Sequence, residues 1–237
     1  MSDLIAELEV WLKENWDPDL TVAAWWERLG LSGWANPTLP EGAYGKGVSR
    51  TDALAVSATI ANHGALGAPA GLGMLLAAPT IAAHGTPEQV DELVRPIVTG
   101  QRAWCQLFSE PGAGSDLAGL GTRAVRDGDE WIINGQKVWT SLAHRARWGL
   151  LLARTNPDVP KHKGLTYFVI DMHGTGVETR PLRQMTGQAE FNEVYFTDAR
   201  IPDAERLGEE GEGWRVAMTT LMNERVSIGG SVTPRGS

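Results

Sequence analysis

Several residue types that build common functional sites are scarce in this chain of 237 residues. Cys105 is the only cysteine, so no internal disulfide and no cysteine-based zinc cluster can form, and we expect a small buried side chain there. The five histidines show neither HxxxH nor HExxH spacing, so the sequence predicts no metal site. The net charge is −8 and no basic tract stands out, which excludes the usual signature of a nucleic-acid partner.

Long apolar runs are also absent. Polar residues and prolines interrupt the Ala- and Gly-rich stretch of residues 53–83, so it lacks the roughly 20 apolar residues in a row that a membrane helix needs. The first residues, MSDLIAELEVWLKENW, are acidic and amphipathic, unlike a secretory signal. We therefore expect a cytoplasmic protein with no membrane span.

Residues 1–102 have the periodicity of an all-α domain. Leu4, Leu8 and Leu12 recur every four residues, as on the apolar face of a helix. Ser49 can cap a helix, and the segment 86–89, Thr-Pro-Glu-Gln, combines a capping Thr, a Pro at the first helical position and a Gln three residues after the cap. A further helix is predicted over residues 71–83.

Residues 103–211 have the pattern of short strands. The Asp127-Gly128 pair between two such segments is a strong hairpin signal. Because no helices separate the strands, an antiparallel β-barrel or sandwich is predicted. The expected strands cover residues 104–108, 122–125, 131–139, 148–154, 165–171, 177–181 and 193–196.

Residues 212–237 turn helical again. Trp214, Met218 and Leu221 form an apolar stripe with no later segment to pack on. The pattern predicts an α+β fold whose last helix belongs to a chain cut short, or to one that completes its core with a partner. We expect exposed apolar surface around these three side chains and a tendency to self-associate.

Two segments combine residue types that suit ligand binding. LFSEPGAGSD, residues 107–116, is a glycine-rich loop after a strand, which lets a ligand approach backbone N–H groups closely. It lacks GxGxxG and a following Walker lysine, so neither a Rossmann nor a P-loop site is supported. NGQKVWTS, residues 134–141, places a flat indole before two hydroxyls. Taken alone, the first segment has a plain tight turn as its alternative, and the second has ordinary strand packing.

Together with three further blocks, these segments resemble the acyl-CoA dehydrogenases over residues 20–230. The blocks are AAHGTPEQVDELVRPIVTGQ, LFSEPGAGSDLAGLGTRAV, WIINGQKVWTSLAHRARWGLLLART, NEVYFTDARIPDAERLGEEGEGW and LMNERVSIGG. The resemblance implies a helical N-terminal domain, a middle β domain and a C-terminal helical bundle. Residues 212–237 would be the first helix of this C-terminal bundle, and the rest of that domain would be missing.

The resemblance implies FAD-dependent α,β-desaturation of an acyl-CoA thioester. By motif, the residues that would contact FAD are Phe108, Ser109, Gly114, Ser115, Trp139 and Ser141. The first two would touch the flavin ring, and the last two would flank it. Gly114 and Ser115 would lie by the pyrophosphate or the acyl-CoA entrance, so Ser115 would also bind substrate. Gln106 departs from the aromatic residue that several relatives carry.

The general base has two possible sources in the family. Many relatives supply it from late in the C-terminal domain, whereas those resembling the isovaleryl-CoA and long-chain enzymes supply it from the helix with a Glu-Arg pair. Here that pair is Glu224-Arg225, so Glu224 is the candidate base and Arg225 a candidate substrate contact. The alternative is that Glu224 is a surface carboxylate while Arg225 contacts the CoA moiety.

The resemblance also implies partners. An electron-transferring flavoprotein would accept the electrons, and a homotetramer or hetero-oligomer would form when the C-terminal domain is present. A chain without that domain is expected to bind FAD weakly. Two alternatives remain open: a non-catalytic partner subunit of a heteromeric acyl-CoA dehydrogenase, and an acyl-CoA oxidase.

Overall fold

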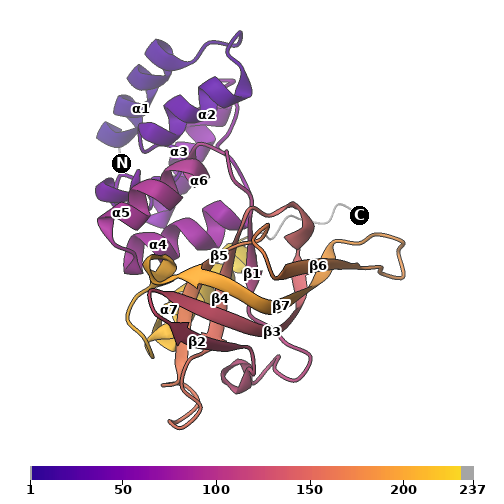
Figure 1. Cartoon of the computed structure of the whole chain (residues 1–237). Helices are drawn as coiled ribbons and strands as arrows, with labels where there is room; N and C mark the ends of the chain where they lie inside the picture. Colours follow the sequence, from indigo (N-terminus) through magenta and orange to yellow (C-terminus); the bar gives the residue numbers. More distant parts are fainter. Residues whose placement is uncertain (1, 231–237) are drawn as a thin grey trace.

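A computed structural model describes residues 2–230 as a helical part, a sheet and one long final helix (Figure 1). The helices of the first part are α1 (Ser2–Asn15), α2 (Val22–Leu31), α3 (Arg50–Asn62), α4 (Ala78–His84), α5 (Pro87–Gln89) and α6 (Arg95–Val98). The strands are β1 (Trp104–Leu107), β2 (Arg123–Asp127), β3 (Glu130–Ser141), β4 (Trp148–Arg154), β5 (Leu165–Asp171), β6 (Val177–Leu182), β7 (Phe191–Pro202) and β8 (Arg206–Leu207). The final helix is α7 (Gly213–Gly230).

The predicted helix caps are confirmed. The Ser49 side chain accepts a backbone N–H from the first turn of α3. Thr86 and Gln89 form a capping box, in which the Gln89 N–H donates to Thr86 Oγ1 at 3.2 Å and the Thr86 N–H to Gln89 Oε1 at 2.9 Å. Gln89 Nε2 also donates to the carbonyls of Ala204 and Arg206, at 2.6 and 2.9 Å. The cap therefore also ties the helical part to the last strand.

The predicted helix over residues 71–83 is only partly correct. Gly73–Ala77 is a π-helical segment that leads into α4, and Val90–Val94 is a second one between α5 and α6. Each ends two residues before a proline, Pro79 or Pro96. Because proline has no N–H to donate, the preceding turn cannot keep regular α-helical pairing.

The strands form one eight-stranded sheet in the order β6-β7-β3-β2-β4-β5-β8, with β1 beside β4. Most neighbours are antiparallel, as predicted, but β1 pairs with β4 in parallel and β2 meets β4 in parallel at a single residue pair. The sheet is not closed into a barrel. Strand β7 is longer than predicted, because its second half pairs with the start of β3 beyond one register shift, and its first two residues pair with the end of β3 beyond another.

Strand β4 is buried on both faces, by other strands of the sheet on one face and by the helical part and α7 on the other. Leu151 of β4 lies in a cluster with Trp131 and Phe168, whose ring centroids are 5.4 Å apart, and this cluster also contains the fully buried Cys105. Leu150, on the opposite face, belongs to the cluster that also includes the helical part and α7. The prediction of a buried Cys105 is confirmed.

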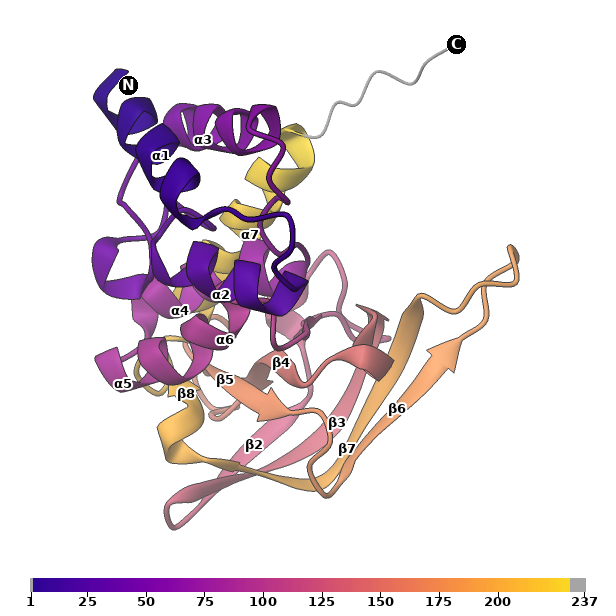
Figure 2. The ribbon, with the colours of Figure 1, turned by 90° about the horizontal axis from the view of Figure 1, so that it is seen from above.

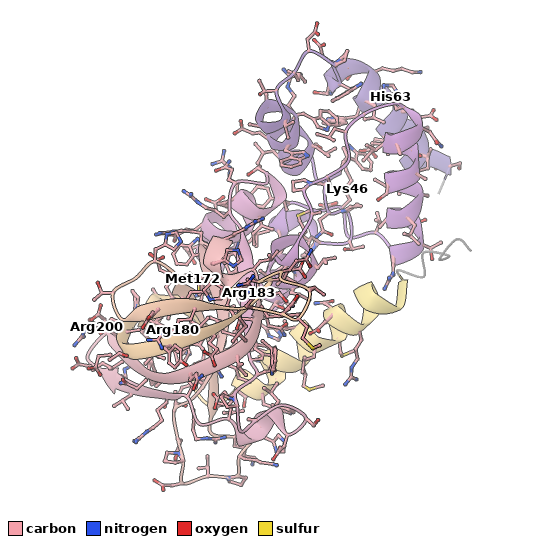
Figure 3. The ribbon with its side chains drawn as sticks, turned by 90° about the vertical axis from the view of Figure 1, so that its right-hand side faces the viewer. Lys46, His63, Met172, Arg180, Arg183 and Arg200 are labelled. Atoms are coloured by element: carbon pink, nitrogen blue, oxygen red, sulfur yellow. The ribbon has the colours of Figure 1, made fainter. Side chains whose placement is uncertain are left out.

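Helix α7 packs against β5 and α4, and it runs from the sheet toward α3 (Figures 2 and 3). Val216 and Ala217 are fully buried on this contact. One turn later, the hydroxyl of Thr220 is 2.9 Å from that of Thr80 and 2.9 Å from that of Tyr167. These three buried hydroxyls fix the position of α7 relative to both neighbouring elements.

Candidate active-site cleft

The residues predicted to form the site lie around one cleft of about 650 Å³ between the sheet and α7. The cleft is lined by Gln106, Phe108, Ser109, Gly114, Ser115, Leu117, Val138, Trp139, Ser141, Phe191, Trp214, Met218, Leu221, Glu224 and Arg225. Loop 108–117 and residues 138–141 form what we call the sheet-side wall. Residues 214–225 of α7 form the helix-side wall. Every candidate site residue lines this cleft.

A tight turn shapes the glycine-rich loop. The Glu110 N–H donates to the Ala113 carbonyl at 2.9 Å, and the Ala113 N–H to the Glu110 carbonyl at 3.1 Å. The Glu110 carboxylate accepts the backbone N–H groups of Gly121 and Thr122, at 2.7 and 2.9 Å. The side chain of Glu110 therefore joins the start of the loop to its end.

A buried lysine lies beneath the same loop. Lys137 is fully buried, and its Nζ donates to Glu110 at 2.8 Å and to the Phe108 carbonyl at 3.0 Å. Burial lowers the pKa of Lys137 to about 8, although Glu110 opposes that shift. Burial alone would raise the pKa of Glu110, but the Lys137 ammonium and the hydrogen bonds outweigh it, and the pKa falls below its usual value. Both groups are therefore charged at neutral pH.

The sequence pattern alone did not predict the role of Lys137. The available signal was the alternation in WIINGQKVW, which places Lys137 on the same face of the strand as Trp131 and Ile133. A buried ammonium needs a charged or strongly polar partner, because burying it unpaired is unfavourable by several kcal/mol. A search for that partner would have included the two acidic residues of the neighbouring loop, Glu110 and Asp116.

Trp139 has an unusual backbone and an exposed ring. Its φ is 61°, in the left-handed region, and it lies at a register shift between β3 and β7. Such a conformation is rare for a bulky residue and is unfavourable by roughly 1–3 kcal/mol. The indole is 63% exposed and meets Phe191 edge-on, at 6.1 Å between ring centroids. The bulge thus presents a flat apolar surface to the cleft.

Gly114 differs from the structurally required glycines of the sheet. A Cβ at Gly114 would meet nothing within 4 Å, and its φ is not positive. At Gly135, by contrast, φ is 153° and a Cβ would lie 2.5 Å from Thr122 Oγ1. The chain itself therefore does not require glycine at 114, whereas a ligand that lies against the backbone would.

The helix-side wall carries the acidic candidate. Glu224 is half-buried, and its Oε2 lies 3.4 Å from Gln106 Nε2 on the opposite wall. Arg225 is exposed at the same end of the cleft. The two walls are thus joined by a hydrogen bond between side chains 118 residues apart in sequence.

The apolar stripe of α7 is less exposed than predicted. Trp214, Met218 and Leu221 are all half-buried, because they line the cleft and two of them also pack on the core. Trp214 meets His162 edge-on at 4.7 Å between centroids. Among the apolar side chains at 214–222, Met222 is the strongly exposed one, at 61%. The apolar surface expected around Trp214, Met218 and Leu221 is therefore only partly exposed.

Two further cavities continue from the cleft. A small one of about 180 Å³ shares Gln106, Trp139, Ser141 and Glu224 with it. Through Leu72, Leu75 and Ser141, the small cavity adjoins a larger one of about 600 Å³, which we call the distal cavity. The distal cavity lies among segments 69–75, 100–104 and 141–145.

Two other classes of site were also sought within residues 2–230. No group of three or more His, Cys, Asp or Glu side chains there is arranged to hold a metal ion. None of the helices in that range has the length and apolar character needed to cross a membrane. The donors around the cleft include hydroxyls, backbone N–H groups, the Gln106 amide and the Arg225 guanidinium.

Comparison with known families defines the class. Residues 4–101 match the N-terminal domain of the acyl-CoA dehydrogenases, and residues 105–199 match their middle domain. The chain belongs to the acyl-CoA dehydrogenase family.

The curated relatives include two proteins from Mycobacterium tuberculosis (strain ATCC 25618 / H37Rv). Acyl-CoA dehydrogenase FadE34 is 59% identical over 152 residues, which are 64% of this chain and 21% of that protein. Acyl-CoA dehydrogenase IpdE1 is 46% identical over 202 residues, which are 85% of this chain and 52% of that protein. The chain thus spans only about a fifth to a half of these relatives' length.

Solved structures share the fold. The Tcur3481-Tcur3483 steroid ACAD matches with a TM-score of 0.73 and 30% identity, over 96% of this chain and 62% of that one. The ChsE4-ChsE5 complex from Mycobacterium tuberculosis matches with a TM-score of 0.70 and 34% identity, over 94% of this chain and 59% of that one. The electron transferring flavoprotein of Acidaminococcus fermentans, at 24% identity and a TM-score of 0.68, is similar in fold alone.

Proposed function

We propose that this chain provides the flavin and thioester site for FAD-dependent α,β-desaturation of an acyl-CoA. The observation that carries the proposal is one cleft in which the exposed Trp139 ring, the open backbone at Gly114 and the Glu224 carboxylate come together. FAD, when bound, would accept the hydride that leaves the β-carbon.

The sheet-side wall fits the cofactor. Trp139 offers a flat apolar surface for a planar ring, and Ser141 lies beside it with a hydroxyl. Ser109 and Ser115 add hydroxyl donors along the loop, where Gly114 leaves room for a ligand next to the backbone. Phe108 would contribute mainly by packing, because its ring is buried and meets Tyr167 edge-on at 5.8 Å.

Glu224 would remove the α-proton of the thioester. That proton is weakly acidic, so the carbonyl must be polarised by hydrogen-bond donors while the carboxylate acts. The donor from Gln106 Nε2 would orient the carboxylate toward the cleft. At the mouth, Arg225 and Ser115 would contact the CoA moiety.

A bulky acyl group is favoured as the substrate. The distal cavity of about 600 Å³ is in the size range of sites for compact organic ligands, and it adjoins the cleft through the small cavity of about 180 Å³. One solved relative is a steroid ACAD. We therefore propose a polycyclic, steroid-like acyl-CoA as the substrate class.

The partners follow from the family. An electron-transferring flavoprotein would take up the electrons, and the full enzyme would be a homotetramer or, as the ChsE4-ChsE5 complex suggests, a hetero-oligomer. A non-catalytic partner subunit and an oxidase are the competing functions.

An anaerobic absorption experiment tests the proposal. The chain is loaded with FAD, freed of excess flavin and mixed with a panel of acyl-CoA thioesters. We expect the flavin bands to bleach with a bulky acyl-CoA, and Glu224→Gln to slow bleaching by about 10²–10⁴-fold. Glu210→Gln, an exposed acid before α7, is the matched control and should bleach normally.

Three other results would contradict parts of the proposal. Retained flavin that never bleaches would favour the partner-subunit function. Rapid reoxidation of bleached flavin by air would favour an oxidase. No retained flavin at all would contradict a flavin site provided by this chain.

A further inference from the structure

We propose that the distal cavity binds an acyl group whose far end carries a carboxylate or another strong hydrogen-bond acceptor, and that Arg102 and Arg145 bind that end. This inference rests on the proposed function, because it takes the Glu224 end of the path as the place of the thioester. It adds a second polar anchor to a substrate that is otherwise apolar.

The two arginines are available to a ligand. Both line the distal cavity and both are exposed. Within residues 2–230, neither guanidinium forms a hydrogen bond or an ion pair with another side chain or carbonyl. Their neighbour Arg147 is different, since it pairs with Asp171 at 2.6 Å.

The fold brings the two arginines to the same end of the cavity. Strands β1 and β4 are parallel and begin opposite each other, at Trp104 and Trp148. Just before them, the Ala103 carbonyl accepts the N–H groups of Arg147 and Trp148, at 2.8 and 3.3 Å. The segments that carry Arg102 and Arg145 therefore run side by side. Two neighbouring guanidinium groups are well suited to a carboxylate, which they can bind through paired N–H donors.

Apart from the neutral polar residues Gln101 and Ser141, the remaining side chains that line the cavity are apolar or aromatic, and none opposes the charge of the arginines. Its lining includes Trp26, Leu72, Met74 and Ile97, and no Asp or Glu among the described residues that line it. In a chain of net charge −8, this combination gives a local positive potential beside an apolar surface. The ligand that matches it has an apolar body and one acceptor end.

The path from the cleft fixes the orientation of that ligand. The small cavity touches Glu224 and Trp139 at one end and Leu72 and Leu75 at the other. The distal cavity continues from the same two leucines to the arginines. A thioester beside Glu224 would therefore direct its acyl group toward Arg102 and Arg145.

Equilibrium binding of matched thioesters to this chain tests the inference. The probes are a homologous series of ω-carboxyacyl-CoAs, each paired with the acyl-CoA of the same length that ends in a methyl group. We expect one range of lengths in which the carboxylate probe binds about tenfold or more tightly, and we expect that preference to weaken as salt is added. Calorimetry measures both affinities without requiring turnover.

The variants Arg102→Gln and Arg145→Gln remove one charge each and should reduce the affinity ratio within a pair about tenfold. Arg183→Gln is the matched control, because Arg183 is exposed, directly follows β6 and is not among the residues that line the distal cavity. Thermal unfolding of each variant checks that folding is intact.

The outcomes are distinguishable. The inference is supported if the carboxylate probe binds more tightly, if both arginine variants reduce that preference, and if Arg183→Gln keeps it. The inference is overturned if the preference is absent at every length, or if it survives in both variants. In either case, binding of the methyl-ended probes still supports the proposed function. Failure of every probe to bind overturns the proposed function and this inference together.

Discussion

The two walls of the cleft are fixed by different chemistry. Beneath the sheet-side wall, the Lys137–Glu110 ion pair lies in the interior, with Lys137 fully buried and the Glu110 side chain 11% exposed. Behind the helix-side wall, the neutral hydroxyls of Thr80, Tyr167 and Thr220 share hydrogen bonds. A buried ion pair that loses one partner leaves an uncompensated charge, whereas a hydroxyl network that loses one member keeps other bonds.

This difference indicates which wall is the rigid one. The ion pair fixes the carbonyl of Phe108 and the start of the glycine-rich loop, so a shift of the loop would require breaking charged contacts. Glu224 lies one helical turn beyond Thr220, whose hydroxyl bonds both neighbouring elements. We infer that the sheet-side wall, the proposed flavin wall, is built for rigidity, and that Glu224, the proposed base, is attached to a wall that is easier to displace.

The largest expected effect comes from breaking the ion pair. Lys137→Met should lower the free energy of unfolding by roughly 3–5 kcal/mol, because Glu110 stays buried without its cation. Urea denaturation followed by tryptophan fluorescence measures the change. Lys161→Met is the control: its pair with Asp116 is 49% and 66% exposed, so we expect about 1 kcal/mol or less. Equal effects of the two substitutions would contradict the comparison.

Replacing Lys137 should also reverse the sign with which the Glu110 carboxyl makes the free energy of unfolding depend on pH. The folded state lowers the pKa of Glu110, so its stabilising contribution is present above the unfolded pKa, near 4.5, and is lost as the pH falls through the lower folded pKa. In Lys137→Met the cation is gone and burial raises the pKa of Glu110, so acidification through that range should relieve the destabilisation. Denaturation series at several pH values measure both slopes. Parallel slopes in the two proteins would contradict a charged pair.

A smaller effect is expected behind α7. Tyr167→Phe removes one buried hydroxyl but leaves the Thr80–Thr220 bond, so the free energy of unfolding should fall by about 0.5–1.5 kcal/mol. Tyr195→Phe, whose hydroxyl bonds Glu193 on the sheet surface, is the control and should change it by less than about 0.5 kcal/mol. A loss for Tyr167→Phe as large as that of Lys137→Met would show that the two walls are not fixed differently.

The smallest effect on stability should come from the loop itself. Gly114→Ala has open space and a permitted φ, so unfolding should change by no more than about 0.5 kcal/mol. FAD affinity should nevertheless fall by about tenfold, because the methyl group would occupy the ligand's place against the backbone. Fluorescence titration with FAD measures this, and Gly112→Ala, also open but not a lining residue of the cleft, is the matched control. Unchanged affinity in Gly114→Ala would argue against a ligand at that backbone.

Local signals predicted much of the fold. The caps at Ser49 and Thr86 were readable because a cap is made by residues three positions apart. The bounds of β4 and β5 were also readable, since both strands are nearly continuous apolar runs between polar turns.

What sequence reasoning missed depends on long-range contacts. Lys137 and Glu110 are 27 positions apart in the sequence. The Thr220 hydroxyl bonds those of Thr80 and Tyr167, which are 140 and 53 positions away. The left-handed backbone of Trp139 arises from the bulge against β7, which no local pattern announces. The candidate site residues came from motif resemblance, while the distal cavity and its arginines became visible only when the segments were brought together.

A structure of this chain determined with bound FAD would test the central claim most directly. The account predicts the flavin ring in van der Waals contact with Trp139, the cofactor passing against the backbone at Gly114, and the Glu224 carboxylate in the same cleft. A flavin bound outside this cleft, or a ring that does not contact Trp139, would contradict it.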